Sequence, residues 1–117
     1  MYATITDRQL MAFKGAPTLE QMQAAVGGYI ETVFRVDSPC RKGVEIDVYA
    51  NEEGLLIGLP IDHINKHTGY PIAGNIVITA SKNGNTIEAT PKEIEAALPF
   101  IGRLAVSATP EMFGLLN

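Results

Sequence analysis

The chain has one cysteine, no tryptophan and only 7% aromatic residues. Because one thiol cannot form an internal disulfide, Cys40 fits a protein of a reducing compartment. No apolar stretch approaches the roughly 20 residues that a membrane-spanning helix needs. No apolar run follows a basic patch near the first residue, as it would in a secretory signal. These absences predict a cytoplasmic protein with no membrane association.

The chain also lacks the basic excess of a nucleic-acid-binding protein. Its 13 acidic and 9 basic residues give a formal net charge of −4, whereas phosphate binding requires a basic face that displaces counterions. We therefore expect no nucleic-acid partner. The remaining composition, 46% hydrophobic and 19% charged over 117 residues, is typical of a globular protein of one domain. We expect that domain to span residues 1–117.

Catalytic signatures are missing as well. The sequence contains no nucleophile elbow, Walker motif, zinc-protease motif or EF-hand loop. The pair Gly27-Gly28 follows a predicted helix and precedes a predicted strand, whereas a phosphate-binding loop lies between a strand and the helix after it. We therefore predict no catalytic residue, no cofactor and no bound metal, and we favour a protein that is not an enzyme.

Two capping boxes mark the predicted helices. Thr18 and Gln21 open the first helix, which Gly27 ends in the left-handed conformation that glycine adopts without strain. Its apolar positions recur at helical spacing and are Leu19, Met22 and Val26. Thr90 and Glu93 open the second helix, with Pro91 at its first position. That helix is predicted to run to Leu98.

Apolar alternation predicts strands along most of the remaining chain. The predicted strands are Tyr2–Thr6, Tyr29–Val36, Val44–Ala50, Leu55–Leu59, Asn75–Ser81 and Asn85–Ala89. Residues 7–10 are predicted as a turn, and residues 60–71 as irregular, with Asp62 capping a single helical turn. The fold class is therefore α+β. We expect a mainly antiparallel sheet of about four to six strands, covered on one face by both capped helices.

Several short motifs occur in a fixed order. They are Val26-Gly27-Gly28-Tyr29-Ile30-Glu31, Asn51-Glu52-Glu53-Gly54, Gly58-Leu59-Pro60, and Gly74 before a strand. In this order and spacing the sequence resembles the family called domain of unknown function 3846 (DUF3846), over about Leu19 to Leu98. The resemblance implies a small protein of bacteria, phages or other mobile elements. It implies no activity, so it transfers no catalytic residue.

A few side chains are candidates for ligand binding. Tyr29 and Glu31 lie on a predicted strand, where partial burial would raise the pKa of the Glu31 carboxyl. His63 and His67 are four residues apart and would share a helical face, as metal-binding histidines do. Asp62 is a third candidate ligand, but no Cys-x-x-Cys motif or second His pair completes a metal site, so two loop histidines are the simpler interpretation. The simpler interpretation of Glu31 is an outward-facing side chain on a solvated sheet face. The alternative is a nucleotide-like small molecule, or a minor enzymatic activity, in a pocket near Tyr29, Glu31 and residues 60–71.

Residues 100–117 are predicted to form a C-terminal tail with a short final helix from Thr109. Its large apolar residues are Met112, Phe113, Leu115 and Leu116. They cannot all face one side of a short helix, so the tail packs either on the protein's own sheet or on a partner. We accordingly predict an uncharacterised binding or regulatory protein that acts by protein–protein contact. Its partner is another protein or a second copy in a homodimer.

Overall fold

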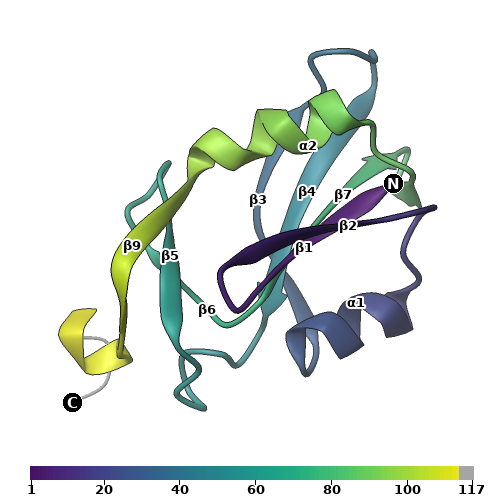
Figure 1. Ribbon diagram of the computed structural model, residues 1–117. Helices are drawn as coiled ribbons and strands as arrows, with labels where there is room; N and C mark the ends of the chain where they lie inside the picture. The colour runs from purple at the N-terminus through teal and green to yellow at the C-terminus, as the bar shows by residue number, and fades with distance from the viewer. Residues whose placement is uncertain (114–117) are drawn as a thin grey trace.

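The computed structural model of the protein describes residues 1–113. Strands dominate this range, which also contains two short α-helices and two 3₁₀ helices (Figure 1). The elements are β1 (Tyr2–Thr6), β2 (Gln9–Phe13), α1 (Leu19–Val26), β3 (Ile30–Asp37), β4 (Val44–Asn51), β5 (Ile61–Asn65), β6 (Pro71–Ala73), β7 (Ile76–Lys82), β8 (Asn85–Ile87), α2 (Pro91–Ala97), η1 (Leu98–Phe100), β9 (Ile101–Ala108) and η2 (Pro110–Phe113). The predicted α+β class is confirmed. Within residues 1–113, neither α-helix has the length and apolar character that a membrane crossing requires.

The strands form two antiparallel sheets. The larger has the order β2-β1-β7-β4-β3, with β8 also paired to β7, and the smaller has the order β6-β5-β9. Ile78 lies at the centre of the larger sheet, between Ala3 of β1 and Val48 of β4. The larger sheet matches the predicted one in strand type and number. The smaller sheet is an addition that the sequence did not lead us to expect.

Both capping boxes are present as predicted. In α1, Thr18 Oγ1 accepts a hydrogen bond from the backbone N–H of Gln21, and the Gln21 side chain accepts one from the N–H of Thr18. Thr90 and Glu93 make the same reciprocal pair at the start of α2. Gly27 ends α1 with φ of 78°, a conformation that strains any residue with a Cβ.

The two helices lie on opposite faces of the larger sheet, so the prediction that they share one face is wrong. Ile94 of α2 packs in the cluster that contains Ile78, whereas Met22 of α1 packs in the cluster that contains Val77. Successive residues of a strand point to opposite faces, and β7 is buried on both of its faces from Ile76 to Ala80. Each face of the larger sheet is therefore covered by a different helix. Capping boxes and helical periodicity do not show which face a helix covers.

Two predicted loops are strands. Residues 9–13 form β2, because Asp7 and Arg8 adopt positive φ and close a tight hairpin on β1. Residues 61–65 form β5 rather than a helical turn capped by Asp62, with Ile61, His63 and Asn65 buried in strict alternation. Two of these buried residues, His63 and Asn65, are polar, so the sequence lacks the apolar alternation that predicts a strand.

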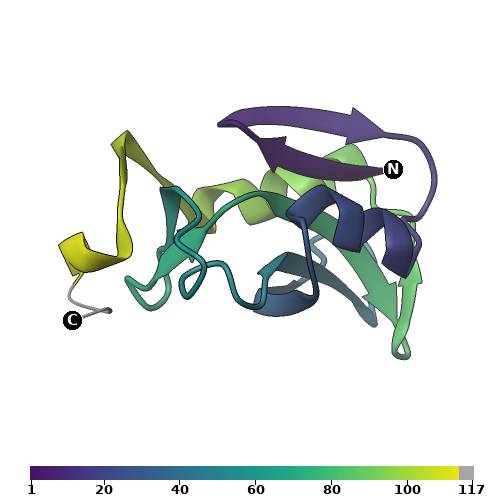
Figure 2. The same ribbon diagram turned by 90° about the horizontal axis from the view of Figure 1, so that it is seen from below.

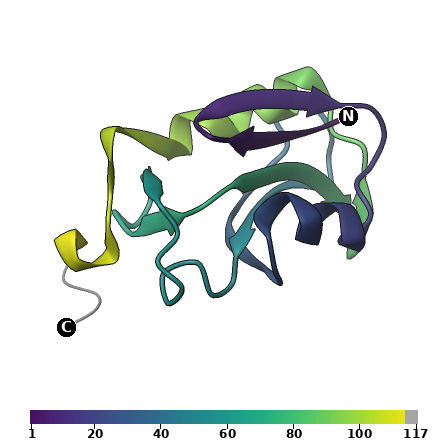
Figure 3. The ribbon, with the colours of Figure 1, turned by 60° about the horizontal axis from the view of Figure 1, so that its bottom comes forward.

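Two further predictions are wrong because of how the strands pair with one another. Leu55–Leu59 is not a strand, since both edges of β4 are already paired, with β3 and with β7. The predicted tail contains a strand, β9, which pairs with β5 and completes the smaller sheet. Beyond β9, the short helix η2 confirms a helical turn after Thr109. Figures 1 and 3 show η2 projecting from the end of β9, away from the larger sheet.

A buried carboxylate joins α2 to the hairpin between β3 and β4. Glu93 is fully buried, and its Oε1 lies 2.5 Å from Nη2 of Arg41 and 2.8 Å from the N–H of Thr90. Burial alone would raise the pKa of Glu93, but hydrogen bonds from Arg41, Ser38 and Thr90 outweigh it and lower the pKa to about 2. The charged form of Glu93 is therefore part of the folded structure.

Candidate functional site

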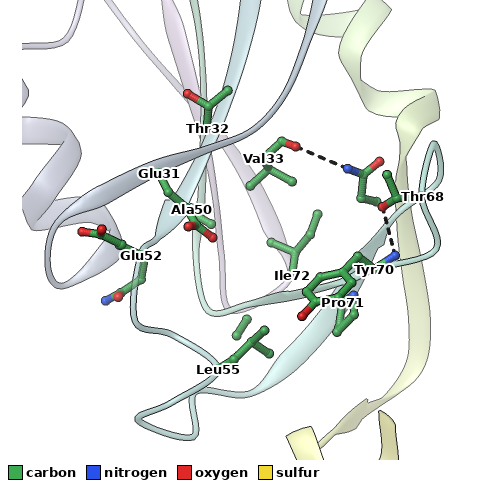
Figure 4. Close-up of a pocket in the computed structure, with 13 residues that line it drawn as sticks. Glu31, Thr32, Val33, Ala50, Glu52, Leu55, Thr68, Tyr70, Pro71 and Ile72 are labelled. Atoms are coloured by element: carbon green, nitrogen blue, oxygen red, sulfur yellow. Dashed lines mark hydrogen bonds between the residues drawn. The ribbon is translucent and has the colours of Figure 1, made fainter. Parts of the chain in front are cut away.

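A cavity of about 330 Å³ lies between the two sheets. Its walls are the β3–β4 end of the larger sheet, the turn after β4, and β6 with the loop before it (Figure 4). The lining residues are Glu31, Thr32, Val33, Ala50, Asn51, Glu52, Leu55, Asn65, Thr68, Tyr70, Pro71, Ile72 and Ala73. Segments far apart in the chain thus meet at one concave surface, which is the commonest setting of a ligand site.

Two buried asparagines fix the walls of this cavity. Asn65 Nδ2 donates to the carbonyl of Val33 (3.3 Å), and its Oδ1 accepts from the N–H of His67. Asn51 Nδ2 donates to the carbonyl of Val26 (3.0 Å), and its Oδ1 accepts from the N–H of Glu53. Both amides are therefore committed to the fold: Asn65 joins β5 to β3, and Asn51 joins the end of β4 to the end of α1.

A β-bulge shapes the upper wall. The pairing of β3 with β4 shifts register between Thr32 and Phe34, so Val33 is an extra residue in β3. A bulge bends its strand and redirects the neighbouring side chains. Here the residues at and before the bulge, Glu31 to Val33, all line the cavity.

The charge of the cavity is negative. Its charged lining residues are Glu31 and Glu52, and within residues 1–113 no cationic group lies within ion-pair distance of either carboxylate. Burial, and then the charge of Glu52, raise the pKa of Glu31 above its usual value. Figure 4 shows the two carboxylates on the same side of the cavity.

Apolar groups form the floor and the opposite wall. Ile72 and Ala50 are buried at the floor, and Leu55 and Val33 are half-buried. The Tyr70 ring lies across the cavity from Glu52 (Figure 4), and 54% of its surface is exposed. Among the described residues, the lining contains carboxylates and hydroxyl groups but no His, Cys, Ser or Lys.

The predicted ligand residues are distributed unequally. Glu31 lines the cavity together with residues of the 60–71 segment, as the small-molecule alternative expects. Tyr29 is not among the lining residues and is 70% exposed. Binding of a small molecule here stays a prediction.

The two histidines are held apart by the fold. His63 is buried in β5, its Nδ1 has no hydrogen-bond partner among residues 1–113, and burial lowers its pKa. His67 follows β5 in a turn, and its ring stacks on Phe100 with centroids 4.3 Å apart. They share no helix, so the spacing of a helical metal pair does not apply. Across residues 1–113 no group of three His, Cys, Asp or Glu is placed to hold a metal.

The predicted contact residues lie only partly within the described chain. Met112, on η2, is 72% exposed, and Phe113 is half-buried. Leu115 and Leu116 lie outside the described residues. A contact surface that sequence reasoning missed is β2, where Leu10, Met11 and Phe13 are exposed. The sequence signal for it is a second apolar run directly after the strand Tyr2–Thr6.

Comparison with known proteins completes the description of the site. A search of curated proteins and a search of solved structures each find no match. A family model described as "Domain of unknown function (DUF3846)" matches residues 4–100. The match includes every residue of the cavity and extends the resemblance seen in the sequence back into β1. The chain therefore belongs to the DUF3846 family.

Proposed function

We propose that this protein is a binding or regulatory protein, without an enzymatic role, that acts by protein–protein contact through the edge strand β2. One observation carries the proposal. All five residues of β2 are exposed, and none of them is charged or a proline. Leu10, Met11 and Phe13 expose 51%, 49% and 38% of their surface. Figure 2 shows β2 as the outermost strand of its hairpin.

The backbone of β2 supports strand addition. Within residues 1–113, β2 pairs with β1 on one side only, so no described strand pairs with the N–H and C=O groups of its other edge. An extended segment of a partner can satisfy these groups, and the side chains on both faces then supply apolar contact. Leu10 and Met11 point to opposite faces of the sheet, so an added strand would contact apolar groups on both.

The opposite edge of the same sheet is protected. β3 carries Glu31, Arg35 and Asp37, and a bulge interrupts it. Charges and bulges are the usual devices by which proteins prevent pairing at an edge. Since β2 has neither device, the contrast favours β2 as the edge that is used.

The experiment compares two charge insertions at exposed apolar positions. Met11→Lys places a charge on β2, and Ile57→Lys makes the same change in the turn after β4, where Ile57 is 57% exposed. Both variants should fold, as checked by circular dichroism. Pull-down from a native host lysate, with size-exclusion light scattering for self-association, should show a contact that Met11→Lys loses and Ile57→Lys keeps.

A photo-crosslinking amino acid at position 11 localises the contact. It should crosslink to the captured protein, or to a second copy, more strongly than the same group at position 57. Equal retention by both lysine variants, or crosslinks from position 57 alone, would refute the role of β2. Recovery of neither a partner nor a dimer would refute protein–protein contact itself.

The remaining elements of the proposal concern its biological setting. We include in it one domain over residues 1–117, a cytoplasmic location, an origin in a phage or other mobile element, and a host or competing-element protein as the partner. The order of the VGGYIE and NEEG motifs supports this setting through the family resemblance. The neighbouring genes test it, because genes of mobile elements travel together.

A further inference from the structure

We propose that the cavity between the sheets binds a small organic cation. The ligand is an amine whose ammonium group lies beside Glu31 and Glu52, and whose apolar part lies against Val33, Leu55 and Ile72. This inference goes beyond the proposed contact at β2, because it needs no protein partner and uses a different part of the molecule.

The cavity is concave and partly open to solvent. The cavity has a buried floor, in which Ala50, Ile72 and Ala73 expose 5% of their surface or less. Its walls come from both sheets, and the hydrogen bond from Asn65 to the Val33 carbonyl joins β5 of one sheet to β3 of the other. A volume of about 330 Å³ lies at the lower end of the range for ligand pockets, roughly 300–1,000 Å³. The occupant is therefore small.

The negative charge of the cavity lining favours a positively charged ligand. Partial burial of Glu31, and then its repulsion by Glu52, raise the pKa of the Glu31 carboxyl. A cation placed beside them removes the repulsion and compensates the desolvation, whereas a phosphate or carboxylate adds to both. The lining contains no Lys, Arg or His to receive an anion. The same charge argues against a nucleotide, whose phosphates would be repelled.

The apolar residues on the opposite side of the cavity favour a ligand that also carries an apolar group. Figure 4 shows Tyr70 and Pro71 across the cavity from Glu52, with Leu55 and Ile72 between them. The N–H of Tyr70 donates to Thr68 Oγ1 (3.1 Å), which positions the backbone that carries this ring. A ligand with an ammonium at one end and an aliphatic or aromatic group at the other would match both sides.

The experiment uses three probes of similar shape and different charge. They are phenethylammonium, the neutral phenethyl alcohol and the anionic phenylacetate, each titrated into the full chain by calorimetry and followed by amide chemical shifts. We expect phenethylammonium to bind at least tenfold more tightly than the alcohol, and phenylacetate not to bind. The shifted amides should be those of residues 31–33, 50–55 and 65–73. Raising the salt concentration should weaken the binding, because part of it is electrostatic.

Matched variants test the two carboxylates. Glu31→Gln and Glu52→Gln should each lower the affinity for phenethylammonium by about tenfold, which corresponds to about 1.4 kcal/mol. Glu95→Gln makes the same change at an exposed position of α2, outside the cavity, and should leave the affinity unchanged. All three positions are exposed, so the variants should keep their fold, as thermal unfolding will check.

Each contrary result has a distinct meaning. Equal affinity for the amine and the alcohol would show a ligand site without selection for charge, and binding of phenylacetate would reverse the inferred sign. Binding of Ca²⁺ alone to the two carboxylates would indicate a metal site instead. If no probe binds at millimolar concentration, the cavity is not a ligand site. Each of these results would overturn the cation proposal and leave the contact at β2 unaffected.

Discussion

The substitution Glu93→Gln should destabilise the protein in a pH-dependent way. Glu93 is fully buried and receives hydrogen bonds from Arg41 and from the N–H of Thr90. Its pKa falls from 4.5 to about 2, and at about 1.4 kcal/mol for each pKa unit this corresponds to roughly 3 kcal/mol at neutral pH. The Arg41 side chain is 38% exposed, so solvent screens its charge, and we expect a loss of about 2 kcal/mol.

The pH dependence follows from the direction of the shift. A carboxyl whose pKa is lower in the folded state stabilises the protein fully above its unfolded pKa, here 4.5, and loses that contribution as the pH falls toward 2. The difference between wild type and Glu93→Gln should therefore be constant from pH 7 to about 5 and shrink below that. At neutral pH the loss corresponds to a decrease of about 8 °C in Tm for a chain of this length.

Urea denaturation followed by far-ultraviolet circular dichroism measures both quantities. The control is Glu95→Gln, which removes a charge from the exposed side of the same helix and should change the free energy of unfolding little. If Glu93→Gln is as stable as Glu95→Gln at pH 7, the ion pair does not stabilise the fold. If the difference from wild type is the same at pH 3 as at pH 7, the pKa argument is wrong.

Three further substitutions test local features. Gly27→Val should lower the free energy of unfolding by about 1 kcal/mol or more, because a β-branched residue is strained at φ of 78°. Thermal unfolding measures this loss, and the control Ala24→Val, on the exposed surface of the helix, should lose less stability. Thr18→Ala removes an N-cap and should cost about 1 kcal/mol by urea denaturation. Burial lowers the pKa of folded His63 below 6.5, so the unfolded chain takes up a proton first and wild type should lose stability as the pH falls below 6.5. His63→Phe should reduce the loss of stability between pH 7 and pH 5. If stability changes with pH as steeply in this variant as in wild type, His63 is not its cause.

Local signals predicted the elements whose formation is decided locally. Thr18 and Thr90 start helices because their hydroxyl groups satisfy nearby backbone N–H groups, and this interaction is complete within four residues. Asn83-Gly84 closes the hairpin of β7 and β8 for a similar reason. These elements were therefore predicted with bounds close to the observed ones.

Elements that depend on distant pairing were not predictable in this way. Leu55–Leu59 has the composition of a strand, but β4 has no free edge for it. β9 exists because β5 lies beside it, some forty positions earlier in the chain. The cavity likewise needs Glu31 and Tyr70 on opposite walls, and the sequence indicated the region but not its residues. Nearness in sequence to Glu31 predicts Tyr29 at the site, whereas its side chain is exposed to solvent outside the cavity lining.

The pairing of β1 with β7 also determines the order in which the protein can fold. Ala3 pairs with Ile78, so β1 is synthesised before β7 but pairs with it only after β7 has been made. At a synthesis rate of about 5–20 residues per second, this delay is on the order of ten seconds. During it, the hairpin of β1 and β2 lacks its partner strand and exposes Tyr2 as well as the apolar residues of β2. Non-local contacts of this kind slow folding, and apolar surface that is exposed during the delay is the kind of surface that chaperones bind.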